Sequence, residues 1–281
     1  LRPPTSEVAL MPVLERGETL EWRRRTSGQQ WLRFVGALGL TAALVAAAAA
    51  ISAQTTWSFV LDAGVQLRDL GMRMFPPEGS YAVTIARPLL DTLHIATLGT
   101  ALGVLIALPL AFAAATTTTP SRVYVRPIAI LLLVTSRSVN SIIWALMLVV
   151  LLGPGIPAGV LAIAFRSVGF VGKLVYEAIE EAPELPVTAM ETTGAGRPQA
   201  LAFGLVPQIL PSMAGVSIYR WEINIREATI LGLVGAGGIG MALQASIDAL
   251  RWSRVSVILL AILATVVFAE LVSARIRRAL G

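Results

Sequence analysis

The chain has 281 residues, of which 56% are hydrophobic and only 14% are charged, and its mean hydropathy is +0.75. Soluble domains average about 45–50% apolar and about 25% charged residues, so this composition predicts an all-α integral membrane protein. The formal net charge is +5, but the sequence lacks the pattern that would indicate nucleic-acid binding, a basic face interleaved with aromatic residues. Zero cysteines and a single histidine exclude disulfides, thiolate metal sites and multi-histidine centres, so we expect no metal.

Residues 1–33 are polar and are predicted to form a cytoplasmic, partly disordered N-terminal tail. They are too long and too charged to be a secretory signal leading into Phe34. The cluster Arg23, Arg24 and Arg25 favours the anionic inner leaflet of a membrane. The remaining residues, 34–281, are expected to form one transmembrane domain.

Six apolar segments fit the length of about 20 residues that a helix needs to cross a bilayer. A break at Gly153 to Pro157 separates the third segment from the fourth. The predicted spans are residues 34–53, 92–115, about 127 to the break, 159–176, about 203–229 and 255–274. Basic residues near span ends stay in the cytoplasm. Placing both termini inside puts twelve arginines in cytoplasmic segments and five outside, which predicts an N-in, C-in topology.

Residues 54–88 form an outer segment between the first two spans. Trp57, Val60, Leu61 and Val65 recur near helical spacing with polar residues elsewhere, which predicts a helix lying along the membrane surface. Pro76 and Pro77 are expected to end it. The segment is either an elbow that leads the chain into the bundle or a docking surface for an external partner.

A glycine-rich stretch, GAGGIG at residues 235–240, satisfies the dinucleotide-binding pattern G-x-G-x-x-G. It follows a membrane span, and no acidic residue stands where ribose would bind, so we expect no cofactor. The alternative is a non-helical outer loop at the mouth of a transport path, with positive φ at several glycines. The residues concerned are Gly235, Gly237, Gly238 and Gly240. The chain also lacks a phosphate-cradling G-x-x-x-x-G-K-[ST] loop, so ATP and its Mg²⁺ must be bound elsewhere.

Ionisable side chains at membrane depth are functional candidates, because an uncompensated charge there costs a few kcal/mol or more. On a helix, Glu222 and Arg226 lie one turn apart in the favourable order, and Arg220, Asn224 and Glu227 share a neighbouring face. Arg166 also interrupts the fourth span. These groups either fix helix packing or line a hydrated anion path, for which arginine offers planar, bidentate donors. The candidate path residues are His94, Arg137, Asn140, Arg220, Glu222, Asn224, Arg226 and Glu227.

A polar loop at residues 181–203 lies between apolar spans, on the cytoplasmic side in this topology. Pro186 suits the first turn of a helix and Gly194 its end, so residues 186–193 are expected to form a short helix. The loop resembles the coupling motif of binding-protein-dependent ABC importer permeases, in which Glu-Ala-Ala is followed by a Gly, then an Ile and then Leu-Pro. Here Thr188 stands in place of the Glu and Gly204 in place of the Ile. The residues that the resemblance assigns to ATPase coupling are Pro186, Thr188, Ala189, Met190, Gly194, Ala195, Arg197 and Pro207.

Within that superfamily the chain is most similar to phosphonate-type permease subunits. The similarity lies in residues 75–77, 169–180, 206–211, 219–226 and 231–240. It implies a type I importer fold in a bacterial-type cytoplasmic membrane and a homodimer with two cytoplasmic ATPases. It also implies an extracytoplasmic binding protein that delivers phosphonate, phosphite, hypophosphite or phosphate. A methionine-type amino-acid permease is the alternative, and a membrane enzyme using Glu222, Arg226 and His94 as acid and base is a distant one.

Overall fold

The computed structural model describes residues 13–16, 19–22 and 27–280, which are helical apart from one short hairpin. Strands β1 (Val13–Arg16) and β2 (Thr19–Trp22) pair antiparallel. Helix α1 (Ser27–Gln54) begins before Phe34, because no proline interrupts the helix-compatible residues that precede the apolar run. Part of the predicted tail is therefore regular structure, while the arginine cluster at residues 23–25 lies outside the described residues.

The predicted outer segment contains two helices instead of one. Helix α2 (Trp57–Leu61) ends at Asp62, and α3 (Ala63–Met74) follows it directly. Helix α3 stops before Pro76 and Pro77, as predicted from the missing amide hydrogens of proline. The chain divides into two compact units between Arg68 and Asp69. The first unit holds α1, α2 and the first half of α3, and it is described separately from the helices that follow.

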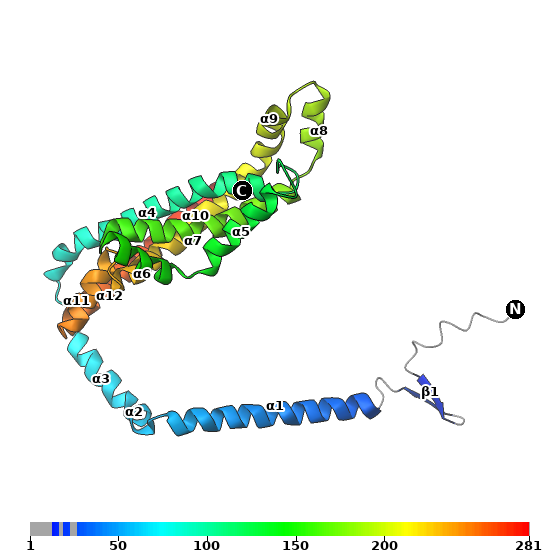
Figure 1. Ribbon diagram of the computed structural model, residues 1–281. Coiled ribbons are helices and arrows are strands. Elements are labelled where there is room, and N and C mark those ends of the chain that lie inside the picture. The colour runs from blue at the N-terminus through cyan, green and yellow to red at the C-terminus, as the bar shows by residue number, and fades with distance from the viewer. Residues whose placement is uncertain (1–12, 17–18, 23–26, 281) are drawn as a thin grey trace. The chain divides into compact units, whose positions relative to one another are not determined.

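The second unit is a bundle built around three long helices, α4 (Tyr81–Ala114), α7 (Ile156–Glu181) and α10 (Val206–Leu233) (Figure 1). Helix α7 lies in the middle and packs against α4, α5, α6 and α10. A Cβ atom built on Gly103 of α4 would lie 2.6 Å from Ser167 Cβ of α7, so these two backbones approach closely. This close approach brings the polar side chains of α4 and α7 within reach of α10.

The third predicted span is broken. Helices α5 (Val125–Ser138) and α6 (Ser141–Leu152) meet at 90°. Asn140 is the N-cap of α6 and its side chain accepts a hydrogen bond from Ile142 N at 3.2 Å. This cap starts a new helix at the end of the polar stretch at residues 135–141, which interrupts the predicted span. The described residues thus contain five continuous helices that could cross a membrane, or six spans if the bent pair counts as one.

A helical hairpin projects from one end of the bundle. It consists of α8 (Leu185–Thr192), α9 (Arg197–Ala200) and a π-helical turn η2 (Leu201–Leu205) that leads into α10. At its base, Glu180 Oε1 accepts a hydrogen bond from Thr116 N at 2.8 Å and lies 3.7 Å from Arg126 Nη2. The ends of α4, α5 and α7 beside the hairpin are therefore tied together.

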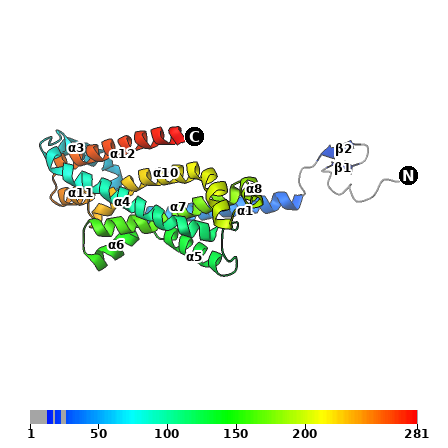
Figure 2. The ribbon, with the colours of Figure 1, turned by 90° about the horizontal axis from the view of Figure 1, so that it is seen from above.

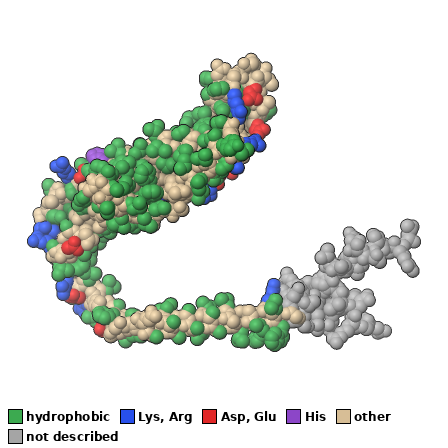
Figure 3. All heavy atoms as spheres, in the orientation of Figure 1, with side chains coloured by type: hydrophobic (Ala, Val, Ile, Leu, Met, Phe, Trp, Pro, Cys, Tyr) green, Lys and Arg blue, Asp and Glu red, His purple; other side chains and the backbone are tan. Residues whose placement is uncertain are grey.

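Helix α11 (Ile239–Asp248) lies at the opposite end of the bundle, and α12 (Trp252–Leu280) runs back toward the hairpin end (Figure 2). At this opposite end Glu78 pairs with Arg254, with 2.9 Å between Oε2 and Nε. The hydrogen bond from Arg254 holds the pKa of the Glu78 carboxyl below its ordinary value. On the face shown in Figure 3, hydrophobic side chains cover the middle of the bundle and charged ones gather at its two ends, as expected for a membrane-spanning protein.

Candidate translocation site and coupling hairpin

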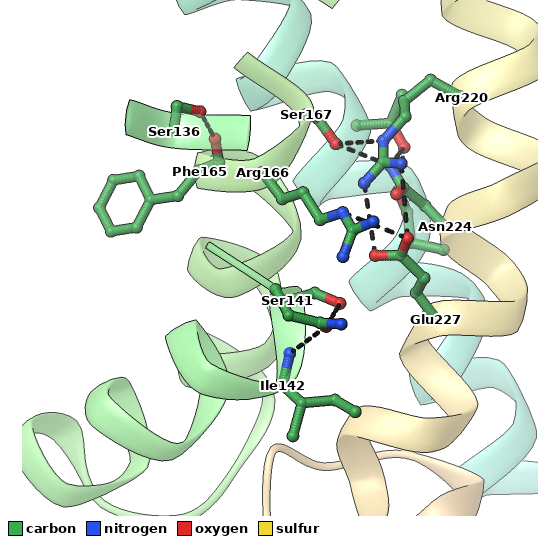
Figure 4. A network of polar contacts seen from close by, with 12 residues as sticks. Ser136, Ser141, Ile142, Phe165, Arg166, Ser167, Arg220, Asn224 and Glu227 are labelled. Carbon is green, nitrogen blue, oxygen red and sulfur yellow. Dashed lines mark hydrogen bonds and ion pairs between the residues drawn. The ribbon is translucent and has the colours of Figure 1, made fainter. Parts of the chain in front are cut away.

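Two of the charged side chains predicted on α10 form a buried ion pair (Figure 4). Arg220 Nη1 and Nη2 donate to the two carboxylate oxygens of Glu227 at 3.4 and 3.3 Å. The residues are about two turns apart on one helix face. Arg220 Nε also donates to Ser167 Oγ on α7 at 3.1 Å, and the Arg220 side chain is only 2% exposed. Protein groups, not water, therefore compensate the Arg220 charge.

Asn224 completes this network on the side of α4. Its Nδ2 donates to Thr100 Oγ1 at 2.7 Å and to Ser167 Oγ at 3.0 Å, and the residue is fully buried. Its Oδ1 has no hydrogen-bond partner among the described residues. A buried acceptor without a partner costs about 1–3 kcal/mol, so this polar network is not optimised for stability alone.

Arg166 joins the same network from α7 and points toward Glu227 (Figure 4). Its Nε lies 3.6 Å from Glu227 Oε1, and its side chain is 30% exposed. We call Arg166, Ser167, Arg220, Asn224 and Glu227 the α7–α10 cluster. Within the described part of the chain, this cluster holds two guanidinium groups and one carboxylate.

Glu222 and Arg226 lie in a second, separate cluster. The predicted pair exists, with 3.3 Å between Arg226 Nη2 and Glu222 Oε1. The other oxygen of Glu222 accepts from Arg277 Nη1 of α12 at 3.1 Å, and Arg277 also donates to Ser273. Glu222 is 9% exposed at the side chain, whereas Arg226 and Arg277 are 49% and 36% exposed. This cluster ties α12 to α10.

The other three candidate path residues do not gather at either cluster. His94 is exposed on α4, and Arg137 is exposed at the end of α5. Asn140 caps α6, so its side chain has a local structural role at the bend between α5 and α6. The candidate path residues therefore fall at several places along the bundle: Arg220, Asn224 and Glu227 belong to one network, and Glu222 and Arg226 belong to the other.

The candidate path predicted from the sequence does not include several polar residues that the structure places in or near these clusters. Ser167 and Thr100 are single hydroxyls in apolar helices, a pattern common wherever helices pack in membranes. Arg166 was noticed as a charge within a span, but its carboxylate partner is remote in sequence. Ser136 likewise joins α5 to α7 by donating to Phe165 O and accepting from Gly169 N at 2.9 Å. Only the charge of Arg166 offered a signal.

The short helix predicted at residues 186–193 is present as α8, with Pro186 in its first turn. Gly194 follows it with φ +88°, and Ala195 N donates to Met190 O at 3.3 Å, which closes the helix end. The side chain of Leu185 is 78% exposed, and Thr188 and Ala189 are exposed as well. Helix α8 thus exposes mainly small, apolar and hydroxyl side chains, with the acidic Glu184 and Glu191 at its two ends.

The hairpin is held by a contact to the bundle and by packing within the hairpin itself. Arg197 Nη2 donates to Thr117 O, in the connection after α4, at 3.2 Å. Pro207 lies in the first turn of α10. A Cβ atom on Gly204 would lie 2.9 Å from Val187 Cα, so the backbone of η2 packs directly on α8. This packing explains why glycine stands at 204, one of the two departures from the coupling motif.

The glycine-rich stretch begins as a loop with unusual backbone geometry. Gly235, Gly237 and Gly238 have φ of +88°, +87° and +76°. Gly240 already belongs to α11 and packs on α10, where a Cβ on Gly232 would lie 2.6 Å from Gly240 Cα. Ile239 N donates to Thr92 Oγ1 at 2.8 Å, which fixes the loop to α4. The loop is therefore a tight packing element between α4, α10 and α11.

No group of three or more His, Cys, Asp or Glu side chains that could hold a metal ion occurs among the residues described. The α7–α10 cluster offers guanidinium donors beside a carboxylate, inside an apolar helical bundle. Such donors suit the oxygens of a tetrahedral anion.

Comparison with protein families and curated proteins gave consistent matches. A model of the family described as binding-protein-dependent transport system inner membrane component matches residues 99–281. The chain is 36% identical over 272 residues to the phosphite transport system permease protein PtxC of Stutzerimonas stutzeri, covering 97% of both chains. It is 37% identical over 221 residues to the phosphate-import permease protein PhnE of Mycolicibacterium smegmatis, covering 79% of this chain and 41% of that protein.

Solved structures of transporters share the fold. The methionine ABC transporter MetNI in inward-facing conformations matches with a TM-score of 0.61 at 20% identity, over 70% of this chain and 96% of that chain. An amino acid ABC transporter crystallised with histidines matches with a TM-score of 0.60 at 17% identity, over 71% of this chain and 95% of that chain. At these identities the similarity shows the fold alone.

Proposed function

Because the chain belongs to the family of binding-protein-dependent transport system inner membrane components, we propose that it forms the translocation path of an ATP-driven importer for phosphorus oxyanions. Members of this family are multi-pass transport subunits and not enzymes. The observation that supports the substrate class is the 36% identity to a phosphite permease over 97% of both chains. Phosphite, phosphonate, hypophosphite and phosphate share the negatively charged, tetrahedral oxygen arrangement that arginine recognises.

The proposed assembly contains a second copy of this chain, two cytoplasmic ATPases and an extracytoplasmic binding protein. Helix α8 and the residues that follow it are the proposed contact for the ATPase, because they project from the bundle and expose Leu185 and Thr188. We further propose an N-in, C-in topology in a bacterial cytoplasmic membrane, with α8 on the ATP side. It places α11 and the Glu78–Arg254 pair on the side of the binding protein, at the other end of the bundle (Figure 1).

An amino-acid importer is the second candidate, since the solved structures with this fold include methionine and amino acid transporters. Fold similarity at 17–20% identity does not define a substrate. The two candidates differ in the charge they require in the path. A zwitterionic amino acid brings its own cation, whereas an oxyanion calls for cationic protein groups such as the pair Arg166 and Arg220.

Transport in a defined system tests the proposal. The permease would be purified with its ATPase, reconstituted in liposomes and supplied with the binding protein encoded beside it. We expect ATP-dependent uptake of labelled phosphite or methylphosphonate, and none of labelled methionine. Uptake of methionine alone would replace the oxyanion assignment by the amino-acid one, and failure of any ATPase to associate would reject the importer.

A further inference from the structure

The α7–α10 cluster carries an excess positive charge inside the apolar bundle. Arg220 occupies both oxygens of Glu227 at 3.4 and 3.3 Å. Arg166 approaches one of these same oxygens at the longer distance of 3.6 Å. Among the described residues, one carboxylate thus serves two guanidinium groups in this cluster, and Arg166 is the less compensated of them.

Arg166 lies deep within α7, far from either end of that helix. It is about 15 Å along the axis from Ile156 and about 22 Å from Glu181, at 1.5 Å per residue. A hydrocarbon core is about 30 Å thick, so lipid phosphates at its surface are out of reach of a guanidinium near its middle. A charge at that depth needs a water-filled path or a counter-ion. The 30% exposure of the Arg166 side chain leaves part of its donor fork free to meet one.

Lys173 lies about two turns from Arg166 on the same face of α7 and is 37% exposed at the side chain, but its Nζ lies 3.4 Å from Glu177 Oε1. Phe170 lies between them, and the Arg220 guanidinium packs over its ring at 5.2 Å from the centroid. On this face of α7, Lys173 thus has a carboxylate of its own, whereas Arg166 has only the longer contact to Glu227, and Arg220 behind it is buried and satisfied.

We propose that Arg166 is the group that pairs with the oxyanion in transit, exchanging its weak contact to Glu227 for two hydrogen bonds to the substrate. This inference rests on the oxyanion importer proposed above. The planar fork of Arg166 matches two oxygens of a tetrahedral anion, and charge-assisted bonds of this kind are the strong ones. Glu227 remains bound to Arg220, so it can reclaim Arg166 when the anion leaves.

Glu227 therefore has a defined part in the passage of substrate. A transport site must hold its substrate firmly enough to admit it and weakly enough to release it. A carboxylate that competes for the same guanidinium lowers the affinity for the anion without removing the site. Arg220 holds that carboxylate in place, and Ser167 accepts a hydrogen bond from Arg220, so both are positioning residues and do not contact the substrate.

The experiment compares four permeases in proteoliposomes with the ATPase and the binding protein: wild type, Arg166→Gln, Arg166→Lys and Arg277→Gln. Uptake of labelled phosphite and methylphosphonate is measured at matched amounts of assembled complex, and assembly is measured separately by size-exclusion chromatography. Arg277 is the matched control, because it is 36% exposed and also shares a carboxylate with a second arginine, Arg226. It belongs to the cluster that ties α12 to α10.

We expect Arg166→Gln to lower uptake about ten- to a hundredfold, the loss of a hydrogen bond to a charged group. Arg166→Lys keeps the charge without the fork, so its uptake should fall between wild type and Arg166→Gln. Arg277→Gln should stay within about fivefold of wild type, because a half-exposed ion pair contributes little.

Three results would overturn the assignment. Wild-type uptake by Arg166→Lys would show that no bidentate contact forms, and this variant decides the question if Arg166→Gln fails to assemble. Equal losses in Arg166→Gln and Arg277→Gln would show a general effect of charge. Dissociation of Arg166→Gln into monomers, with a stable Arg166→Lys dimer, would assign Arg166 to a carboxylate of the second copy. Absence of oxyanion uptake by the wild type would instead reject the proposed function itself.

Discussion

Glu222 of α10 and Arg277 of α12 are joined by a hydrogen bond of 3.1 Å, although they lie far apart in the sequence. The other oxygen of the same carboxylate binds Arg226 at 3.3 Å. Glu222 is the buried member of this cluster, and its two partners are half exposed. Two arginines therefore compensate one carboxylate, and either of them can do so alone.

This redundancy predicts the stability of a set of variants. Arg226→Gln and Arg277→Gln should each lower stability by less than about 1 kcal/mol, whereas the double variant should lose about 3–5 kcal/mol because Glu222 is left buried and unpaired. Adding Glu222→Gln to the double variant should restore most of the loss. Thermal unfolding of the purified complex measures this, and a double variant as stable as either single one would contradict the shared-carboxylate arrangement.

Gly194 provides a test of the coupling hairpin. Its φ of +88° strains any β-branched residue, but the space around it is open, so Gly194→Val should perturb only the end of α8. We expect ATPase binding or coupled transport to fall while the bundle still folds. Gly196→Ala is the matched control, because Gly196 lies in the same loop with φ −66° and also has room. Normal ATPase binding and transport by Gly194→Val would separate α8 from coupling.

Two glycines of α10 should respond in opposite ways to alanine. Gly232→Ala would bring a Cβ to 2.6 Å from Gly240 Cα, so α11 must shift and stability should fall by about 1–3 kcal/mol. Gly215 has no atom within 4 Å of its built Cβ, so Gly215→Ala should be neutral or should stabilise the helix by up to about 1 kcal/mol. Melting temperatures of the two variants decide this, and equal shifts would refute close α10–α11 packing.

Single cysteines test the N-in, C-in topology, since the chain has none of its own. Cysteine at Arg197, in the hairpin, should react with an impermeant maleimide only from the cytoplasmic side. Cysteine at Gly79, at the opposite end, should react only from outside. Both positions are exposed, so failure to react would not follow from burial. Labelling of position 197 from outside would reverse the proposed orientation.

The Glu78–Arg254 pair predicts a pH dependence at the α11 end of the bundle. The pKa of Glu78 is lowered by the Arg254 hydrogen bond, so the pair contributes fully above the ordinary carboxyl value of 4.5 and is lost as pH falls below it. Hydrogen exchange around residues 78–81 should therefore accelerate in acid relative to the rest of the bundle. Glu78→Gln should abolish this difference. If this wild-type loop had the same relative protection from exchange above and below pH 4.5, the result would count against the pair.

Features that depend on neighbouring residues were predictable from the sequence. The apolar lengths, the helix start at Pro186, its end at Gly194 and the Glu222–Arg226 pair all arise from interactions within a few residues of chain. The bend between α5 and α6 was missed: the polar stretch at residues 135–141 was assigned to one continuous span, because hydropathy does not register a capping side chain. The single helix predicted for the outer segment was likewise divided at Asp62.

The composition of the candidate site depended on the tertiary structure. Glu227 of α10 meets Arg166 of α7, and Arg220 of α10 meets Ser167 of α7, because these two helices pack against each other. Arg277 reaches Glu222 only because α12 folds back along α10. Sequence shows that a charge at membrane depth must be compensated, since desolvation makes an isolated charge costly. Packing alone selects its partner, because residues distant along the chain become neighbours only when the helices assemble.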